Sequence, residues 1–365
     1  MKLLNGIVLQ AFLAGLTLLF CVALGELGVR LLQYVSDGRP VISQMAPTNF
    51  WRMFDPDLGW RTPANQRQIY TIKDGAGVDH EVHYSTGRYG FRLYGDTKSR
   101  KTKIMIVGDS YTQALAVSDD QTYYAKLKNN LSDRMPVEIF AYGTVGYGTL
   151  QELMIVERHI KEIMPDIIIF QVCSNDFINN SIELESQSLG NNSHSLRPYI
   201  GIDGTITMQI PQSPLDKGVL GRVSRHSRFL QWVIPLLHNQ GVVKTSTVED
   251  EIRDQGTTHP GFMRAVALTD RLFGGLRSAV PAATKIYAFQ ADNLQPYSGE
   301  FEKLFPRHGI TYFKGVAEAV TDAFQKGEVV YPWNDDHWAS TGHTIVAEIL
   351  ANRLRRDLEK PSVSH

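Results

Sequence analysis

Four short segments of this sequence carry residue types that nucleophilic catalysis requires. The first contains Ser110, in Gly108-Asp109-Ser110, which follows an apolar run typical of a strand and precedes a helical pattern. A serine at such a junction is exposed, and its own N–H points into the same space as its hydroxyl. On its own, this segment is more often an ordinary helix N-cap, so the other segments must decide.

Two further segments could supply hydrogen-bond donors to a developing negative charge. Gly143, Gly146 and Gly148 follow the second predicted strand, and glycine lets a main-chain N–H approach a reacting oxygen closely. Asn175 follows the third predicted strand, where its amide could donate to the same oxygen. An ordinary strand-to-helix turn would also explain the glycines, and a turn or helix cap would explain the asparagine.

The fourth segment, WNDDHWASTGH, precedes the last predicted helix and supplies a candidate base. In a roughly extended chain, residues two apart project to the same side, so Asp335 could orient the ring of His337 while Asp336 points away. His343 is a competing base, but its place at a helix start favours capping or packing. A solvated loop would also explain these residues.

The four segments fall at strand ends in a regular alternation of apolar runs and helical patterns. Because the carboxyl ends of parallel strands share one edge of an open α/β sheet, the candidate residues should gather there. The alternation predicts a three-layer α/β/α domain over residues 101–358. Its strands are expected at about 103–107, 137–141, 166–172, 285–290 and 310–313, and its helices at about 120–134, 150–164, 261–280, 298–308, a segment through 324, and 342–358.

Two segments break this alternation. Residues 178 to about 260 are expected to form an insertion that holds a hairpin and a short helix around 229–238, and long insertions often form lids or binding walls. Residues 35–100 are expected to form a linker followed by an irregular extension with short strands, wrapped on the main domain.

An apolar stretch near the start of the sequence predicts a membrane helix. Residues 6–25 hold no charge, and about 20 helical residues cross a hydrocarbon core. The stretch exceeds the usual apolar core of a cleaved signal peptide, so we expect a single-pass anchor within residues 1–34, with an uncleaved or long signal as the alternative. Basic residues flank both ends, but the short basic start favours a domain outside the cytoplasm, in the periplasm or the extracellular space.

Composition excludes several other classes of protein. The 37 basic and 38 acidic residues leave a net charge of -1, which gives no basic field for nucleic acid. Two cysteines cannot form a disulfide framework, and neither an HExxH nor a CxxC motif indicates a metal. Phosphoryl transfer is a distant possibility because no GxxxxGK[ST] loop is present. No cofactor is expected.

Taken in order, the four segments resemble the SGNH (GDSL-type) hydrolase superfamily. The resemblance implies a flavodoxin-like parallel sheet, with Ser110 as nucleophile and with Asp335 and His337 completing a catalytic triad. It also implies an oxyanion hole built from the Ser110 N–H, the Gly146 N–H and the Asn175 amide. The sequence departs from the family in two ways: Cys173 stands where the family commonly has glycine, and the acid lies two residues before the histidine instead of three.

The resemblance implies a serine-dependent ester hydrolase or O-acyl transferase that works through an acyl-serine. The DxHW form, with Trp338 after His337, resembles variants in enzymes of exopolysaccharide acetylation, which favours an acylated cell-envelope carbohydrate or lipid as substrate. The alternative is a non-catalytic envelope protein that retains the fold to bind glycans or to assist assembly.

Overall fold

The computed structural model divides the chain into two compact units. It describes residues 2–37, 50–188, 190–201, 203–212, 227–230, 233 and 247–358. One unit comprises Met1–Asn49 and Gln212–Thr247, and the other comprises Phe50–Pro211 and Val248–His365. All of the candidate catalytic residues belong to the second, larger unit.

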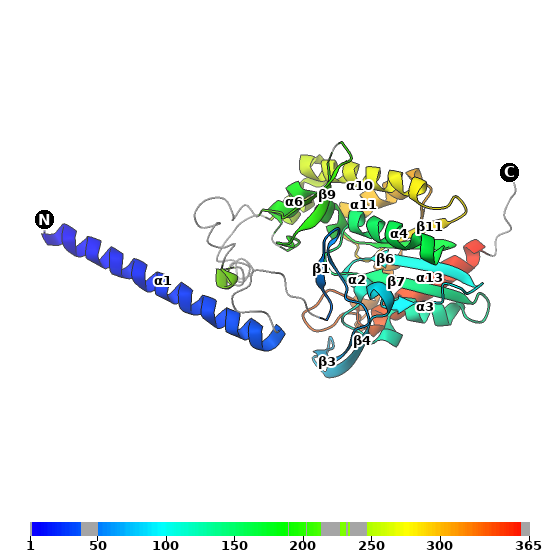
Figure 1. Cartoon of the computed structure of the whole chain (residues 1–365), viewed down its shortest axis with the longest axis horizontal. Coiled ribbons are helices and arrows are strands. Elements are labelled where there is room, and N and C mark those ends of the chain that lie inside the picture. The colour runs from blue at the N-terminus through cyan, green and yellow to red at the C-terminus, as the bar shows by residue number, and fades with distance from the viewer. Residues whose placement is uncertain are drawn as a thin grey trace. The chain divides into compact units, whose positions relative to one another are not determined.

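A six-stranded sheet forms the centre of the larger unit (Figure 1). Its strand order is β12-β11-β8-β6-β7-β5, and all neighbours are parallel except β5 and β7. The strands are β5 (Leu93–Tyr94), β6 (Thr102–Gly108), β7 (Val137–Gly143), β8 (Ile167–Val172), β11 (Lys285–Gln290) and β12 (Thr311–Tyr312). The five parallel strands have the flavodoxin-like order, which confirms the predicted fold class.

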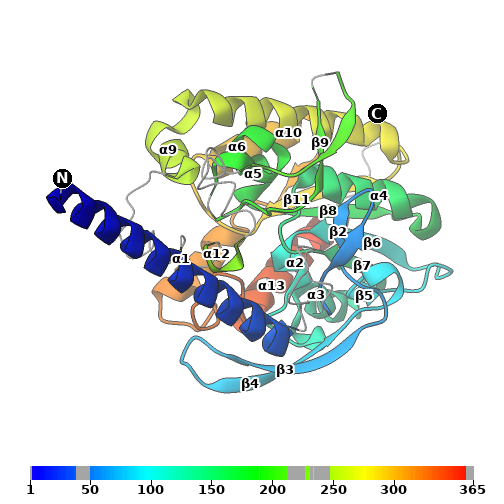
Figure 2. The same ribbon diagram turned by 60° about the vertical axis from the view of Figure 1, so that its left-hand side comes forward.

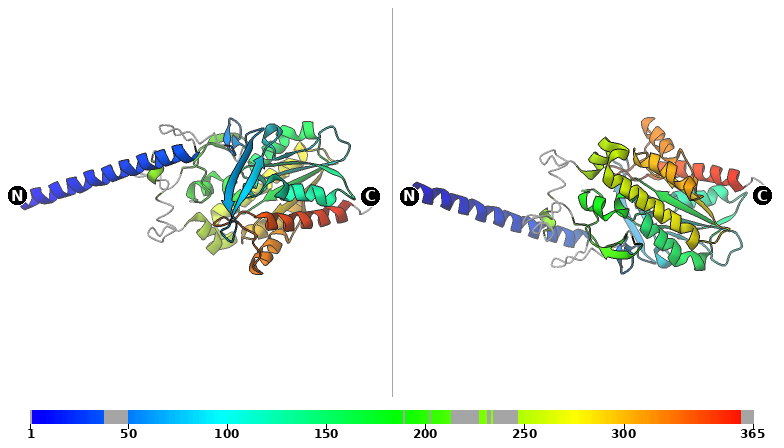
Figure 3. Two further views of the ribbon diagram at one scale, coloured as in Figure 1. Left: turned by 90° about the horizontal axis from the view of Figure 1, so that it is seen from below. Right: turned by 90° about the horizontal axis from the view of Figure 1, so that it is seen from above.

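Helices cover both faces of the sheet (Figures 1 and 3). One face carries α4 (Thr149–Ile163), α10 (Pro260–Ala279) and α11 (Tyr297–Arg307), and the other carries α3 (Tyr123–Leu131), α12 (Val316–Gln325) and α13 (Ser340–Leu358). Alternate residues of each strand point to opposite faces, so Phe170 of β8 joins the first core and Ile169 joins the second.

The segment before this sheet is more regular than the sequence predicts. It contains the antiparallel hairpin β1–β2 (Met53–Asp55, Gly59–Arg61) and the antiparallel hairpin β3–β4 (Arg67–Lys73, Asp79–Ser85), of which the second is labelled in Figure 2. A short 3-10 helix η1 (Arg88–Gly90) follows. It then supplies the antiparallel edge strand β5, and Phe91 packs edge-on against Tyr142 with ring centroids 5.1 Å apart. From residue 50 onward, this segment therefore packs on the main domain, whereas the linker expected before it lies mostly outside the described residues.

The insertion holds the expected hairpin. Strands β9 (Arg197–Ile200) and β10 (Ile206–Gln209) pair antiparallel after α5 (Asn175–Asn180) and α6 (Ile182–Gln187). Helix α9 (Val248–Gln255) and the 3-10 helix η4 (Gly256–Thr258) lead into α10. The helix predicted around 229–238 lies mostly outside the described residues; those that are described, 229–230 and 233, are helical, as is 228.

Helix α1 (Lys2–Asp37) belongs to the smaller unit. Within the described residues it is the one helix long and apolar enough to cross a membrane, over Phe12–Leu32, and a signal sequence has the same properties. The side chains described in this stretch are exposed or half-exposed, including Phe20 and Leu24. An anchor and a signal sequence both remain compatible with this helix.

Candidate active site

Ser110 is the first residue of the short helix α2 (Ser110–Gln113), directly after β6. Asp109 caps this helix, because its Oδ1 accepts the Tyr111 N–H at 3.0 Å. The helix lies close to the end of β7, where a Cβ on Gly143 would be 2.3 Å from the Gln113 nitrogen. Glycine at this position therefore lets the serine helix pack against the neighbouring strand.

The structure brings Ser110, His337 and Asp335 together in one hydrogen-bonded chain. His337 Nε2 lies 2.7 Å from Ser110 Oγ, and its Nδ1 lies 2.5 Å from Asp335 Oδ1. Ser110 and His337 are 227 residues apart in the sequence. Their side chains meet because the segment before α13 comes back to the end of β6. The serine can thus give its proton to a base whose other ring nitrogen is held by a carboxylate.

A second hydrogen bond accompanies the ring contact between Asp335 and His337. Asp335 Oδ1 also accepts the His337 main-chain N–H at 3.0 Å, and Asn334 has a left-handed φ of 53°. Asp336 consequently does not point fully away, as its Oδ1 lies 3.4 Å from His337 Nδ1. Its side chain is 92% exposed, however, so water screens its charge.

Aromatic rings fix the position of the histidine. The Tyr111 ring lies 4.9 Å from the His337 ring and 4.8 Å from Trp338, which is buried. The Tyr111 hydroxyl donates to the Asp336 carbonyl oxygen at 3.1 Å. The residue that follows the nucleophile and the residue that follows the base therefore pack against each other.

The charges around His337 favour its protonated form. Burial lowers the pKa of His337, but the hydrogen bond and the charge of Asp335, aided by Asp336 and Asp109, outweigh burial and raise that pKa above its ordinary value of 6.5. The hydrogen bond to His337 lowers the pKa of Asp335 below 3.8, although burial acts in the opposite direction. An imidazolium formed during proton transfer would be stabilised in this site.

Gly146 is held in a left-handed conformation, with a φ of 75°. Arg197 Nη2 donates to its carbonyl oxygen at 2.9 Å, and the preceding Val145 N–H donates to Gln113 Oε1 at 2.8 Å. The N–H of Gly146 itself has no acceptor among the described residues. The insertion hairpin and the serine helix thus fix the loop and leave this donor open.

Asn175 begins α5, immediately after the loop that ends β8. The Cys173 thiol donates to Asn175 Oδ1, which directs the amide oxygen toward Cys173 and its Nδ2 away from it. Within the part of the chain that the structure describes, neither Asn175 Nδ2 nor the Ser110 N–H has an acceptor. The three donors expected for an oxyanion hole are therefore open, and each lies at the carboxyl end of a strand.

Three charged residues that the sequence does not single out support these loops, of which Arg92 and Arg197 are buried and Asp292 is half-buried. Asp292, after β11, accepts the Ser174 N–H at 3.1 Å and the Ser174 hydroxyl at 2.5 Å, next to Asn175. Burial raises the pKa of Asp292, against the opposing effect of its hydrogen bonds from Ser174 and Gln290. The carboxylate links the end of β11 to the segment that carries the amide.

Arginines support the other two loops. Arg92 donates to the Gln113 and Val117 carbonyl oxygens at 2.6 and 2.5 Å and so holds the chain that follows the serine helix. Arg197 forms a fully buried pair with Glu185 at 2.7 Å while it holds Gly146. The sequence shows only that Arg92 and Arg197 are charged; their burial and their partners are not visible in it.

His343 does not compete with His337 as a base. It is buried, and its Nδ1 accepts the Tyr123 N–H at 3.2 Å. Burial, followed by the charge of Arg92, holds the pKa of His343 well below 6.5. It packs in the core, as expected, and it caps α3 instead of the helix α13 to which it belongs.

The ligand atoms of Asp335, Asp336 and His337 lie within 4.8 Å of one another, a spacing that could also hold a cation. Such a cation would need His337 Nδ1, the atom through which Asp335 orients the ring.

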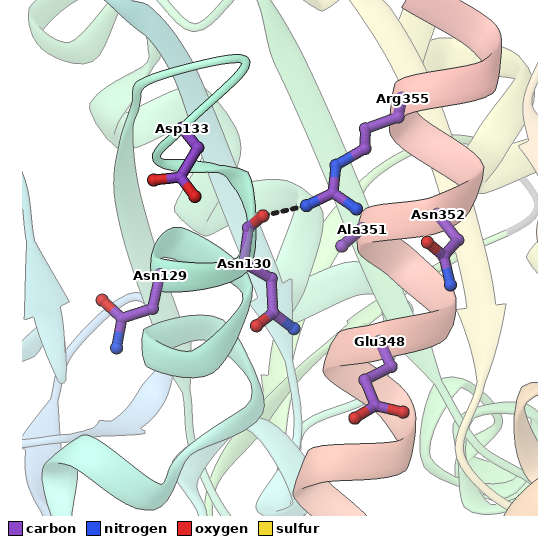
Figure 4. Close-up of a pocket in the computed structure, with 7 residues that line it drawn as sticks. All are labelled: Asn129, Asn130, Asp133, Glu348, Ala351, Asn352 and Arg355. Atoms are coloured by element: carbon purple, nitrogen blue, oxygen red, sulfur yellow. Dashed lines mark hydrogen bonds between the residues drawn. The ribbon is translucent and has the colours of Figure 1, made fainter.

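A cavity of about 420 Å³ between α3 and α13 contains none of the candidate residues (Figure 4). There, Arg355 donates to the Asn130 carbonyl oxygen at the end of α3.

No protein-family model matches the chain, and no curated protein matches it. Among solved structures, it is similar to a lipolytic protein of the G-D-S-L family from Veillonella parvula, at 10% identity and a TM-score of 0.38, with 70% of this chain and 99% of that chain covered. It is also similar to the esterase EstA from a Pseudoalteromonas species, at 8% identity and a TM-score of 0.39, with 71% of this chain and 100% of that chain covered. A third similar structure is the acetylxylan esterase Axe2 from Geobacillus stearothermophilus, at 12% identity and a TM-score of 0.35, with 73% of this chain and 97% of that chain covered.

Proposed function

We propose that this protein is a serine-dependent ester hydrolase or O-acyl transferase. The observation that carries the proposal is the hydrogen-bonded chain from Asp335 through His337 to Ser110. Open donors on three neighbouring loops support it, because acyl transfer requires both an activated nucleophile and a site for negative charge.

The reaction has two halves. His337 Nε2 takes the proton from Ser110 Oγ as that oxygen attacks the ester carbonyl carbon. The negative charge on the carbonyl oxygen is received by the N–H groups of Ser110 and Gly146 and by the Asn175 amide. The tetrahedral species then expels the alcohol, which takes the proton from His337, and an acyl-serine remains.

The second half repeats these steps with a new nucleophile. Water or a sugar hydroxyl gives its proton to His337 and attacks the acyl-serine, and collapse returns the proton to Ser110. Water gives hydrolysis, and a sugar hydroxyl gives acyl transfer. No residue of this scheme needs a metal or an organic cofactor.

The proposed substrate is an acylated carbohydrate or lipid of the cell envelope. The apolar helix α1 supports this proposal, because a single-pass anchor would hold the catalytic unit at a membrane surface. We propose that this unit lies in the periplasm or outside the cell. A reporter fused after His365 should then be active only where it is exported, and activity of a cytoplasmic reporter would contradict the orientation.

A fluorophosphonate probe tests the proposed chemistry. Full-length protein in detergent should be labelled and should hydrolyse short-chain aryl esters, while Ser110→Ala should lose both properties. Ser132→Ala, which removes an exposed hydroxyl at the end of α3, is the matched control and should keep both. A folded wild-type protein that is neither labelled nor active would favour the alternative, a glycan-binding or assembly protein without catalysis.

A further inference from the structure

Two hollows share Trp333 and Asp335 in their linings. The first has a volume of about 310 Å³, and its lining includes Trp51, Tyr70 and Lys73. The second, of about 490 Å³, is lined by Phe324 and other residues. Trp333 and Asp335 line both hollows, and the Trp333 side chain is 53% exposed. The indole therefore forms a partly exposed aromatic ridge that belongs to both hollows.

The β3–β4 hairpin holds this ridge in place. The Trp333 N–H donates to the Lys73 carbonyl oxygen at 3.1 Å, and Gly77 lies beneath the indole, since a Cβ there would be 3.6 Å from the ring. At Gly75 a Cβ would be only 2.6 Å from the Tyr331 carbonyl oxygen, so the hairpin and the loop are in close contact. Two segments about 260 residues apart in the sequence thus build one rigid aromatic surface.

We infer that these hollows bind a sugar residue of the acylated substrate, which rests on the proposed function and narrows it to carbohydrate esters. A sugar ring has an apolar face of C–H groups and an edge of hydroxyls. The negative face of an indole attracts polarised C–H groups, while carboxylate and amide side chains accept and donate hydrogen bonds at the edge. Trp333, Asp335 and Asn334 provide this combination at one place.

The charges of the lining favour an uncharged sugar. Among the described residues that line the hollows, the cation is Lys73, and it already pairs with Asp79 at 2.8 Å. Asp335 and the exposed Asp336 contribute negative charge. A uronic acid would therefore be repelled.

The position of the hollows suits an ester substrate. Asp335 lines both of them and also contacts His337, whose Nε2 contacts Ser110. The hollows therefore adjoin the aspartate end of the hydrogen-bonded chain that leads through His337 to Ser110. A glycan of a few residues can occupy the ridge while an acyl group on a neighbouring residue reaches Ser110.

Binding is measured first, without turnover. Full-length Ser110→Ala protein in detergent is titrated by calorimetry with a panel of neutral tetrasaccharides and with uronic acid oligomers of equal length. We expect at least one neutral tetrasaccharide to bind and the uronic acid oligomers to bind more weakly. In this background, Trp333→Ala and Tyr70→Ala should each weaken binding about fivefold to tenfold, as expected for the loss of one aromatic contact.

Kinetics then relate the surface to the reaction. For Trp333→Ala, the loss of kcat/KM on the acetylated form of the bound tetrasaccharide should exceed the loss on an aryl acetate by about fivefold to tenfold. Trp333→Tyr keeps an aromatic ring and should have most of the wild-type kcat/KM on the acetylated tetrasaccharide. Phe54→Ala removes another exposed aromatic ring, which does not line the hollows, and should change neither rate.

Two sets of outcomes separate this inference from the proposed function. If wild-type protein is labelled at Ser110 but no neutral sugar binds, or if Trp333→Ala and Tyr70→Ala reduce both esters equally, the sugar site is wrong and the esterase remains. If neutral sugars bind and Trp333→Ala weakens them, but wild-type protein hydrolyses no ester, the sugar site stands and the proposed chemistry is wrong.

Discussion

Asp335 and Asp336 are adjacent and carry the same charge, yet their surroundings differ. Asp335 Oδ1 accepts both the ring and the main-chain N–H of His337, whereas Asp336 is almost fully exposed. Asp335→Asn keeps the shape but disfavours the ring tautomer that accepts the serine proton. We expect it to lower kcat by about 10²–10⁴ and Asp336→Asn to change kcat by less than about threefold.

Steady-state kinetics on an aryl ester measures both variants, and their melting temperatures serve as the folding control. A larger loss in Asp336→Asn than in Asp335→Asn would show that the other carboxylate orients the base.

The pH dependence of kcat/KM reports the protonation of His337 in the free enzyme. Only the neutral imidazole can accept the serine proton, so activity falls as the pH falls through the pKa of this residue. Because Asp335 raises that pKa, the acid limb should have its midpoint above 6.5. The residual activity of Asp335→Asn should have its midpoint at a lower pH, since the main cause of the increase is removed.

The test is to measure kcat/KM between about pH 5 and 9 on a substrate that does not itself titrate in this range. A wild-type midpoint below 6, or a midpoint that Asp335→Asn moves upward, would contradict the assigned charge interaction.

Asp292 is expected to act through Asn175. Its carboxylate fixes Ser174, and Asn175→Ala alone should reduce kcat by about 10²–10³ with little change in KM. We expect Asp292→Asn to lower kcat about tenfold, but to have little further effect once Asn175 is alanine. Single-turnover acylation rates are measured for the wild-type protein, the two single variants and the double variant. If the effects of the two substitutions on this rate are additive, Asp292 has a general structural role and does not act through Asn175.

At the scale of elements, the insertion hairpin contributes directly to the site. Arg197 of β9 is buried, pairs with Glu185 of α6 and holds the carbonyl oxygen of Gly146. Removing one member of a buried pair leaves the other charge without compensation. Arg197→Ala should therefore lower the free energy of unfolding by about 3–5 kcal/mol and should also lower kcat.

Denaturant unfolding measures the free energy of unfolding of Arg197→Ala and of the double variant Arg197→Met, Glu185→Leu. The double variant should recover much of the stability because no charge remains buried, whereas its kcat should stay low because Gly146 is no longer held. Full recovery of kcat would show that Arg197 does not position the loop.

The sequence predicts some elements well and others poorly, for physical reasons. Strands such as β8 are buried on both faces and are therefore continuous apolar runs, and their predicted bounds agree with the structure within about two residues. Strand β5, with only Leu93 and Tyr94, is too short for any periodicity and was not predicted. The prediction that Asp336 points away from His337 is wrong in part, because its Oδ1 lies 3.4 Å from His337 Nδ1.

At the scale of the whole molecule, contacts between distant segments build the site. Ser110, His337 and Asp335 could be predicted because each stands in a short pattern of its own. Asp292 and Arg197 could not, since their partners Ser174 and Gly146 are 118 and 51 residues away in the sequence. A single sequence contains no record of these pairings, which arise only when the sheet brings the loops to one edge.

The central claim is that an acyl group is carried on Ser110, and one measurement tests it directly. Full-length wild-type protein is mixed with an activated acetyl ester, quenched in acid within milliseconds to seconds, digested and examined by mass spectrometry. We predict a mass increase of one acetyl group on the peptide that contains Ser110, which appears before steady state and is absent from Ser110→Ala. Steady turnover of the ester with no acetyl group on Ser110 at any time would contradict the account.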